Sequence, residues 1–129
     1  MTRLLLDTHL LLWWLADDPR LSAAAVEQIR APDAEVFISH ASLWELAIKT
    51  SLGRVQVDLT ELERQVSALG FRWLPIRTSH LQAVATLETD GLHRDPFDRL
   101  LVCQSRVEPL RLLTVDRQLL RYGATVVGV

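Results

Sequence analysis

Short apolar runs that look like buried β-strands alternate with helix-like segments along the whole chain. The strand-like runs lie at residues 3–6, 36–38, 71–76, 111–115 and 125–127. Helical patterns occupy residues 8–16, 23–29, 39–52, 60–69, 78–87, 96–106 and 117–122. Short, continuous runs of leucine, valine and isoleucine are typical of strands that are covered on both faces, as in a parallel sheet. The alternation therefore predicts an α/β fold with a mainly parallel sheet.

Capping residues and proline mark several of the expected element boundaries. Ser22 is suited to begin the second helix, and residues 60–63 have the pattern of a capping box. Thr78 or Ser79 is expected to begin the helix that follows. Because Pro75 has no N–H to donate, residues 71–76 are expected to form a short or edge strand.

Size and composition favour one cytoplasmic domain over residues 1–129. The 129 residues are 49% hydrophobic, which is enough for a substantial core. A net charge of −2 does not indicate a protein held on nucleic acid by bulk positive charge. The apolar runs are too short for a membrane span or a secretory signal. Cys103, the single cysteine, is expected to be buried and to have a packing role.

Acidic residues stand at several points where a strand gives way to a helix. Asp7 follows the first strand-like run and Asp116 follows the fourth. Asp95 is placed to cap a helix that begins at Pro96, and Asp98 falls in its first turn. A helix N-terminus stabilises one carboxylate by about 0.3–1 kcal/mol, which does not account for the others. In parallel α/β sheets, functional groups gather beyond the carboxyl ends of the strands, where the strand order reverses.

Glu45 is a further candidate, although a lone glutamate among apolar residues of a helix more often faces solvent. Carboxylates that converge on one edge require a positive partner. A hard divalent cation such as Mg²⁺ binds oxygen ligands and activates water for attack on a phosphodiester. The histidines and Cys103 lack the paired spacing of a zinc site.

Other catalytic arrangements are not indicated. Ser39, His40 and Ser42 are neighbours in sequence, but they lack the Gly-x-Ser-x-Gly turn and an ordered acid partner. The chain also has no glycine-rich phosphate loop of the Walker or Rossmann type.

Four segments, taken in order, closely resemble the PIN domain, and more narrowly its VapC-type toxin branch, the nuclease half of bacterial type II toxin–antitoxin pairs. They are residues 7–9 (DTH), 42–49 (SLWELAIK), 93–101 (HRDPFDRLL) and 113–116 (LTVD). The resemblance covers essentially the whole chain. It implies a three-layer α/β/α sandwich, one PIN domain over residues 1–129, and an endoribonuclease that uses Mg²⁺, with Mn²⁺ as a substitute.

The motif match also implies roles for individual residues. The family's acidic quartet, which would bind the metal and catalyse hydrolysis, corresponds to Asp7, Glu45, Asp98 and Asp116. Asp7 and Asp98 would be direct ligands, Asp116 would act directly or through water, and Glu45 would orient water or bind a second ion. Asp95 is an additional catalytic acid of this subgroup, and its contact with metal is left open. The resemblance further implies an RNA substrate, a homodimer and an antitoxin whose segment enters the acidic groove.

Polar and aromatic residues near these motifs are candidates for binding RNA. Arg94, Arg99 and Arg117 flank the acids and are suited to contact phosphate, although Arg99 and Arg117 could instead pair with neighbouring carboxylates. Thr114 resembles the small hydroxyl residue that the family keeps beside the site, and it has an equally good explanation as a strand-end residue. Of the four tryptophans, Trp44 and Trp73 are expected to pack, and Trp13 or Trp14 to leave the core for an interface.

The leading hypothesis is a metal-dependent ribonuclease toxin. A PIN nuclease of RNA processing or DNA repair is an alternative, but the chain carries no additional module. A PIN-like protein-binding module without activity is a second alternative. All four quartet acids are present, which argues against that reading, because clustered carboxylates are costly to keep without a use.

Overall fold

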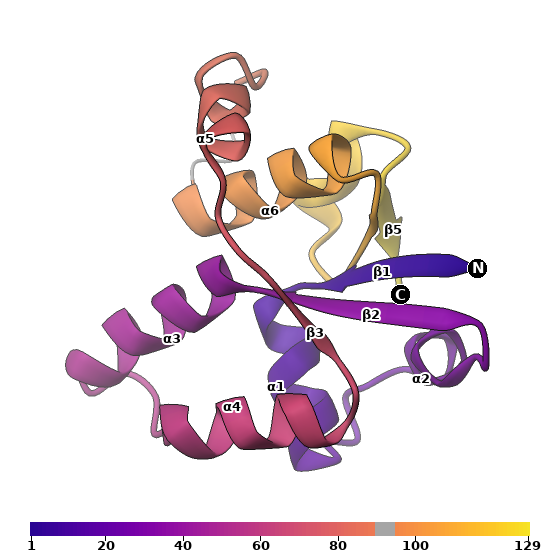
Figure 1. Ribbon diagram of the computed structural model, residues 1–129, viewed down its shortest axis with the longest axis vertical. Coiled ribbons are helices and arrows are strands. Elements are labelled where there is room, and N and C mark those ends of the chain that lie inside the picture. The colour runs from indigo at the N-terminus through magenta and orange to yellow at the C-terminus, as the bar shows by residue number, and fades with distance from the viewer. Residues whose placement is uncertain (90–94) are drawn as a thin grey trace.

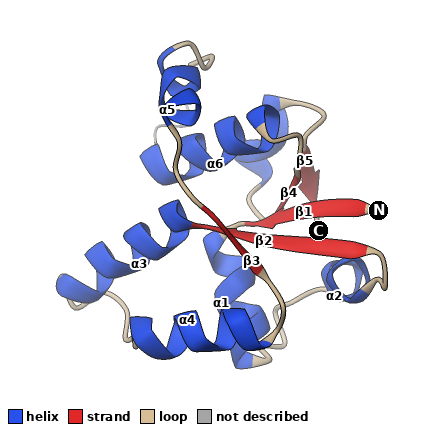
Figure 2. Cartoon of the chain, viewed as in Figure 1, coloured by secondary structure: helices blue, strands red, loops and turns tan. Residues whose placement is uncertain are grey.

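A five-stranded, all-parallel sheet forms the centre of the computed structural model, which describes residues 1–89 and 95–129. The strand order is β3-β2-β1-β4-β5, and each neighbouring pair is parallel. The strands are β1 (Thr2–Leu6), β2 (Ala34–Ser39), β3 (Arg72–Leu74), β4 (Arg111–Thr114) and β5 (Val126–Gly128). The helices are α1 (Thr8–Ala16), α2 (Ala23–Arg30), α3 (His40–Ser51), α4 (Leu59–Ala68), α5 (Thr78–Ala85), α6 (Pro96–Val107) and the 3₁₀ helix η1 (Arg117–Tyr122) (Figures 1 and 2).

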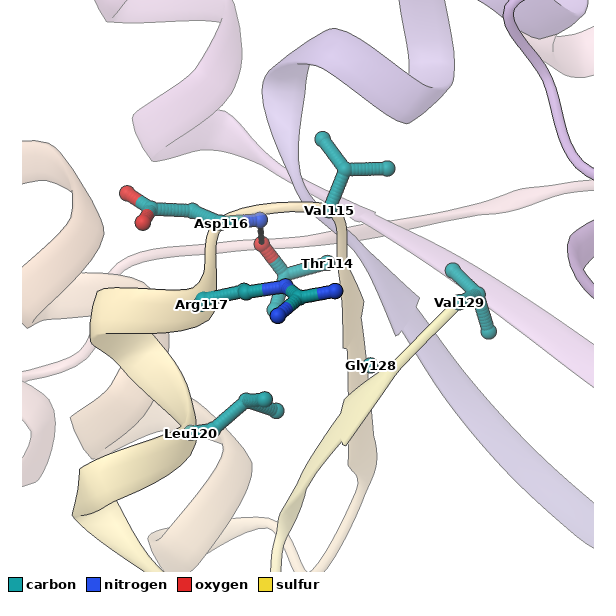
Figure 3. A pocket seen from close by; sticks show the side chains of 7 residues that line it. All are labelled: Thr114, Val115, Asp116, Arg117, Leu120, Gly128 and Val129. Atoms are coloured by element: carbon teal, nitrogen blue, oxygen red, sulfur yellow. Dashed lines mark hydrogen bonds between the residues drawn. The ribbon is translucent and has the colours of Figure 1, made fainter.

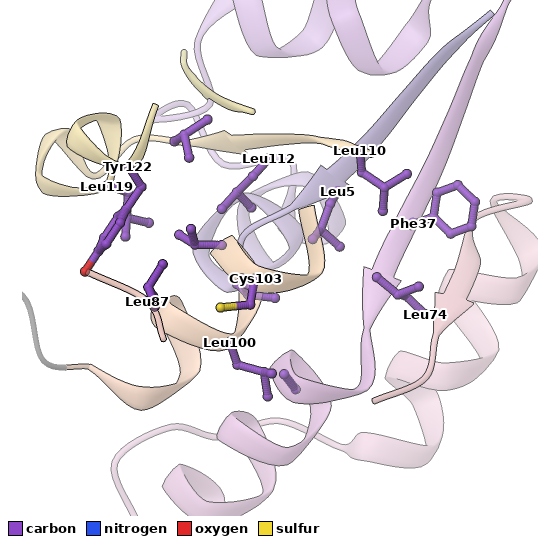
Figure 4. Close-up of a cluster of buried hydrophobic side chains, with 14 residues drawn as sticks. Leu5, Phe37, Leu74, Leu87, Leu100, Cys103, Leu110, Leu112, Leu119 and Tyr122 are labelled. Carbon is purple, nitrogen blue, oxygen red and sulfur yellow. The ribbon is translucent and has the colours of Figure 1, made fainter. Parts of the chain in front are cut away.

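Helices cover both faces of the sheet, and β1 supplies side chains to both. Leu5 belongs to a cluster with α6, η1 and the end of α5, part of which Figure 4 shows. Leu4 and Leu6 point to the opposite face, where they pack with residues of α1, α2, α3 and α4. Both faces of β1 are apolar because a parallel strand is buried on both sides. The predicted α/β fold and its three-layer α/β/α arrangement are confirmed.

The strand order reverses between β1, the central strand, and its neighbour β4. From β1 the chain proceeds outward to β2 and β3, and then crosses to β4 and β5 on the other side. Leu6 at the end of β1 is in register with Leu113, and the Asp7 N–H donates to the Leu113 carbonyl at 3.1 Å. This junction is the position at which a parallel α/β sheet opens a crevice.

The expected element boundaries are largely confirmed, with two corrections, both at helix caps. Asp58 caps α4 by accepting from the Glu61 N–H at 3.1 Å, so the capping box at residues 60–63 was wrong. At α5 the backbone N–H of Arg77 donates to His80 Nδ1 at 2.9 Å, so neither Thr78 nor Ser79 is the cap. The helix expected over residues 117–122 forms with the same bounds, as a 3₁₀ helix.

Three other expectations are confirmed. The short strand β3 lies at an edge of the sheet, Ser22 caps α2, and Cys103 is buried in the core. Within residues 1–89 and 95–129, none of the helices has the length and apolar character needed to cross a membrane.

Candidate active site

Asp7 lies buried at the junction of β1 and β4. It caps α1, and its Oδ1 accepts from the Leu10 N–H at 2.8 Å. Its Oδ2 accepts from the Thr114 hydroxyl at 2.6 Å. Burial raises the pKa of Asp7 above its usual range, and the hydrogen bond from Thr114 opposes that rise. Both carboxylate oxygens are therefore held in fixed positions at the end of the first strand.

Thr114 links the end of β4 to the end of β1. Its buried hydroxyl donates to Asp7 and accepts from the Asp116 N–H at 3.0 Å. Asp116 in turn caps η1, since its Oδ1 accepts from the Gln118 N–H at 2.9 Å. Thr114 thus helps to position both acids at the strand ends. We assign it this positioning role in place of the expected contact with substrate.

Glu45 is also buried, contrary to the solvent-facing position that its local sequence pattern favours. Its Oε1 accepts from the Thr8 hydroxyl at 2.7 Å, and its Oε2 accepts from Lys49 Nζ at 2.6 Å. Thr8 follows Asp7 directly, so α1 and α3 are tied together beside the site. Thr8 and Lys49 were not among the predicted site residues, although the spacing of four between Glu45 and Lys49 is the signal of a helical ion pair.

Asp95 and Asp98 are brought to the same region by the N-terminus of α6. As predicted, Asp95 is the cap: its Oδ1 accepts from the N–H groups of Phe97 and Asp98 at 2.9 and 3.0 Å. The pKa of Asp98 is raised to about 7, first by burial and then by four negative neighbours. They are Asp95, Glu45, Asp7 and Asp116. The other four predicted acids therefore lie within electrostatic reach of Asp98.

The donor set suits a hard cation. It consists of carboxylate and hydroxyl oxygens, which Mg²⁺ and Mn²⁺ prefer to nitrogen or sulfur ligands. In the part of the chain that the structure describes, no three His, Cys, Asp or Glu side chains are arranged closely enough to enclose an ion. Mg²⁺ in proteins usually keeps several waters and is bound by one or two carboxylates together with a substrate phosphate.

Comparison with known proteins settles the family. The family model of the PIN domain matches residues 4–124. The chain belongs to the PIN-domain family. Ribonuclease VapC22 of Mycobacterium tuberculosis is 33% identical over 125 residues, which cover 92% of this chain and 91% of the relative. The resemblance seen in the sequence is thereby confirmed.

Solved structures share the fold of this chain, among them a toxin–antitoxin complex from Klebsiella pneumoniae with a TM-score of 0.63 and 18% identity, covering 95% of this chain and 94% of that one. VapBC2 from Rickettsia felis, bound to a DNA fragment from its promoter, matches with a TM-score of 0.72 and 16% identity, covering 99% of this chain and 98% of that one. VapBC-1 from nontypeable Haemophilus influenzae matches with a TM-score of 0.68 and 18% identity, covering 99% and 97%. At these identities the likeness concerns the fold.

The three candidate arginines of this PIN domain have different surroundings. Arg94 lies outside the described residues. Arg99 is buried, and its guanidinium donates to the carbonyls of Leu87 and Glu88 at 3.3 and 3.2 Å and to the Tyr122 hydroxyl at 3.1 Å. Because these bonds hold the buried guanidinium within the chain, we assign Arg99 a structural role in place of the expected phosphate contact.

Arg117 is the described arginine that remains a candidate for substrate. It is exposed and extends from η1 across a hollow of about 320 Å³ that Asp116 and Thr114 also line. Figure 3 shows this hollow between η1, the end of β4 and the end of β5. Arg117 thus lines the same hollow as Asp116, but its guanidinium and the Asp116 carboxylate extend in opposite directions.

Aromatic side chains of the PIN domain are also placed differently from expectation. Trp44 is 53% exposed, so the prediction that it packs was wrong. It meets Phe97 edge to face, with ring centroids 4.9 Å apart, next to Glu45 and Asp98 in sequence. Trp13 and Trp14 are both half-buried.

Proposed function

We propose that this PIN domain, residues 1–129, is a divalent-metal-dependent endoribonuclease that acts as the toxin of a toxin–antitoxin pair. The observation that carries the proposal is the convergence of Asp7, Glu45, Asp98 and Asp116 on the carboxyl edge of the sheet, where β1 and β4 meet. The name of the relative, ribonuclease VapC22, supports RNA as the substrate.

Asp7 and Asp98 would be direct ligands of the cation and Asp116 would act directly or through water, while Mg²⁺ or Mn²⁺ would supply Lewis acidity toward water and phosphate when bound. Thr114 keeps the first and last of these acids in register through its two hydrogen bonds. Glu45 lies against Thr8 and is suited to orient the attacking water. Asp95 organises the first turn of α6, from which Asp98 projects.

Arg117 would contact RNA phosphate from the rim of the site, and Arg94 remains a proposed contact. An antitoxin partner is supported by a solved structure of the same fold, the toxin–antitoxin complex from Klebsiella pneumoniae. A second copy of the chain is proposed as a further partner. The cytoplasm, where RNA and a newly made antitoxin are both present, is the proposed place of action.

The test is cleavage of total cellular RNA by the purified chain with Mg²⁺, with Mn²⁺ and with EDTA. We expect discrete fragments with either metal and none with EDTA. The Asp7→Asn variant should be inactive with an intact fold, because asparagine still caps α1 and removes a buried charge. Asp58→Asn is the matched control: it makes the same change at the exposed cap of α4 and should keep full activity.

Cleavage that persists in EDTA, or in Asp7→Asn, would overturn the proposed metal role. Failure to cut RNA under any condition, with intact binding of Mn²⁺, would favour a different nucleic-acid substrate. Failure to bind Mn²⁺ would favour a protein-binding role instead.

A further inference from the structure

Glu45 differs from Asp7, Asp95 and Asp116 in the kind of hydrogen-bond donor from which it accepts. Asp7, Asp95 and Asp116 accept from neutral groups, namely backbone N–H groups and the Thr114 hydroxyl. Glu45 accepts from an ammonium, with Lys49 Nζ 2.6 Å from its Oε2. A full positive charge is thus present in the acidic site before any metal binds.

The geometry holds Lys49 in this position. Glu45 precedes Lys49 by one helical turn on α3, which is the favourable order for such a pair. The Glu45 side chain is 7% exposed, and a carboxylate this deeply buried requires a charged or hydrogen-bonding partner. Lys49 is 35% exposed, so its stem reaches in from the surface and its ammonium lies at the boundary of the site.

The second oxygen of Glu45 is also engaged. The hydroxyls of Thr8 and Ser42 lie 2.9 Å apart and share a hydrogen bond. Thr8 has one proton, and the carboxylate is the stronger acceptor for it, so Ser42 supplies the proton between the two hydroxyls. Both oxygens of Glu45 are therefore bound to donors on α1 and α3.

We propose that Lys49 takes the place of a second divalent ion beside Glu45, so that the acidic site binds one ion through the remaining carboxylates. Two-metal sites hold their ions about 3.5–4 Å apart. An ammonium bound to Glu45 repels a second cation placed beside that carboxylate. It also engages the carboxylate oxygen that a second cation would need as a ligand. Lys49 is thus a positioning residue that sets the metal stoichiometry. The inference rests on the proposed function, in which these acids bind a divalent metal.

The test measures the binding of Mn²⁺ alone to the full chain after treatment with EDTA. Binding is monitored by calorimetry and by the electron paramagnetic resonance signal of free Mn²⁺. The wild-type chain should bind one equivalent. Lys49→Met, which keeps the length of the side chain without its charge, should bind a second equivalent at least tenfold more tightly than any second ion in the wild type. Lys49→Arg should restore a stoichiometry of one.

Two further variants separate charge from structure. Lys49→Gln keeps a hydrogen-bond donor for Glu45 but not the charge, so it should also admit a second ion and serves if Lys49→Met does not fold. Arg64→Met breaks the ion pair with Glu61 on α4 and causes the same loss of charge. It should leave one equivalent bound.

The outcomes distinguish this inference from the proposed function. Two equivalents in the wild type, or one equivalent in both the wild type and the uncharged Lys49 variants, would overturn the role of Lys49 while leaving a metal site intact. No binding of Mn²⁺ by any of the proteins would overturn both.

Discussion

Thr114 shows how much of the candidate site depends on one hydroxyl group. It donates to Asp7, just beyond β1, and accepts from the backbone of Asp116, just beyond β4. Such supporting groups orient metal ligands, and their loss commonly lowers metal affinity or activity by about 10–100-fold. The hydroxyl therefore determines the separation of two acids that come from distant parts of the sequence.

Replacing Thr114 with valine keeps the shape of the side chain and removes both hydrogen bonds. We expect RNA cleavage to fall by about 10–100-fold, and the free energy of unfolding by about 1–3 kcal/mol, because Asp7 loses a buried donor. Thr114→Ser should retain most activity, since it keeps the hydroxyl. Full cleavage activity in a folded Thr114→Val protein would show that the acids do not depend on this link.

The raised pKa of Asp98 gives the metal-free protein a defined dependence on pH. Its pKa is about 7 when folded, against an ordinary value of 3.8, so between these values the folded state holds more protons than the unfolded state. Stability should therefore fall as the pH rises from about 4 to 7, and the penalty should be complete above 7.

Asp98→Asn should remove that penalty. In EDTA at pH 8 we expect the variant to be more stable than the wild type by about 1–2 kcal/mol, a figure reduced for the partial solvent exposure of the site. At pH 4 the two should be equal. Urea unfolding at both pH values measures the difference, and Asp58→Asn should show no such dependence. A variant that is less stable at pH 8 would contradict the crowding of the acids.

At the scale of single elements, helix α6 combines two roles. Its N-terminus presents Asp95 and Asp98 to the site, and its body is buried against the sheet. Arg99, one residue after Asp98, points the other way and binds the chain just beyond α5 and the Tyr122 hydroxyl at the end of η1. The orientation of the acids therefore depends on how the opposite face of the same helix is packed.

A pair of arginine variants should separate these roles. Arg99→Met should lower the free energy of unfolding by about 2–4 kcal/mol, because it removes a buried charged donor and leaves its acceptors unpaired. Arg117→Met should change it by less than about 0.5 kcal/mol, since Arg117 is exposed. Urea unfolding provides the measurement. Equal loss of stability in the two variants would contradict the difference in burial.

Most elements could be predicted from the sequence because their signals are local. Continuous apolar runs marked the strands, and Asp95-Pro96 marked the start of α6, which forms as expected. The caps of α4 and α5 were missed because several nearby residues were capable of capping. The chain selects Asp58 for α4 and the His80 ring for α5. That ring is also bonded to Glu108, far along the sequence, at 2.6 Å.

The positions of the acids were predictable from topology, but the directions of neighbouring side chains were not. Strand order places Asp7 beside Asp116, whereas the burial of Glu45 depends on Thr8 and Lys49. The inward turn of Arg99 and the exposure of Trp44 also depend on packing between helices. The local sequence gives no signal for either. The interactions that support the site are thus the part that required the structure.

At the scale of the whole molecule, charge sets limits on how RNA is held. The chain has a net charge of −2, and its acids converge at the carboxyl edge of the sheet. Phosphate approaching that edge without metal meets repulsion, which a bound divalent cation would offset. RNA affinity should therefore come from a few local contacts and the metal, rather than from a broad basic surface.

This charge distribution predicts a weak dependence of RNA binding on salt. For single strands, the logarithm of the binding constant falls with the logarithm of salt concentration with a slope of about −0.7 for each phosphate contact. With one or two contacts, the slope measured in EDTA, where the proposed function allows no cleavage, should be about −1.

Arg117→Met should bring this slope closer to zero by about 0.7. Arg64→Met, which removes the same charge on α4, should leave the slope unchanged. Fluorescence anisotropy with labelled RNA, at KCl concentrations from about 50 to about 200 mM, measures the slope for the wild type and for each variant. A slope steeper than about −4 would require several further phosphate contacts and would contradict binding through a small local set of basic residues.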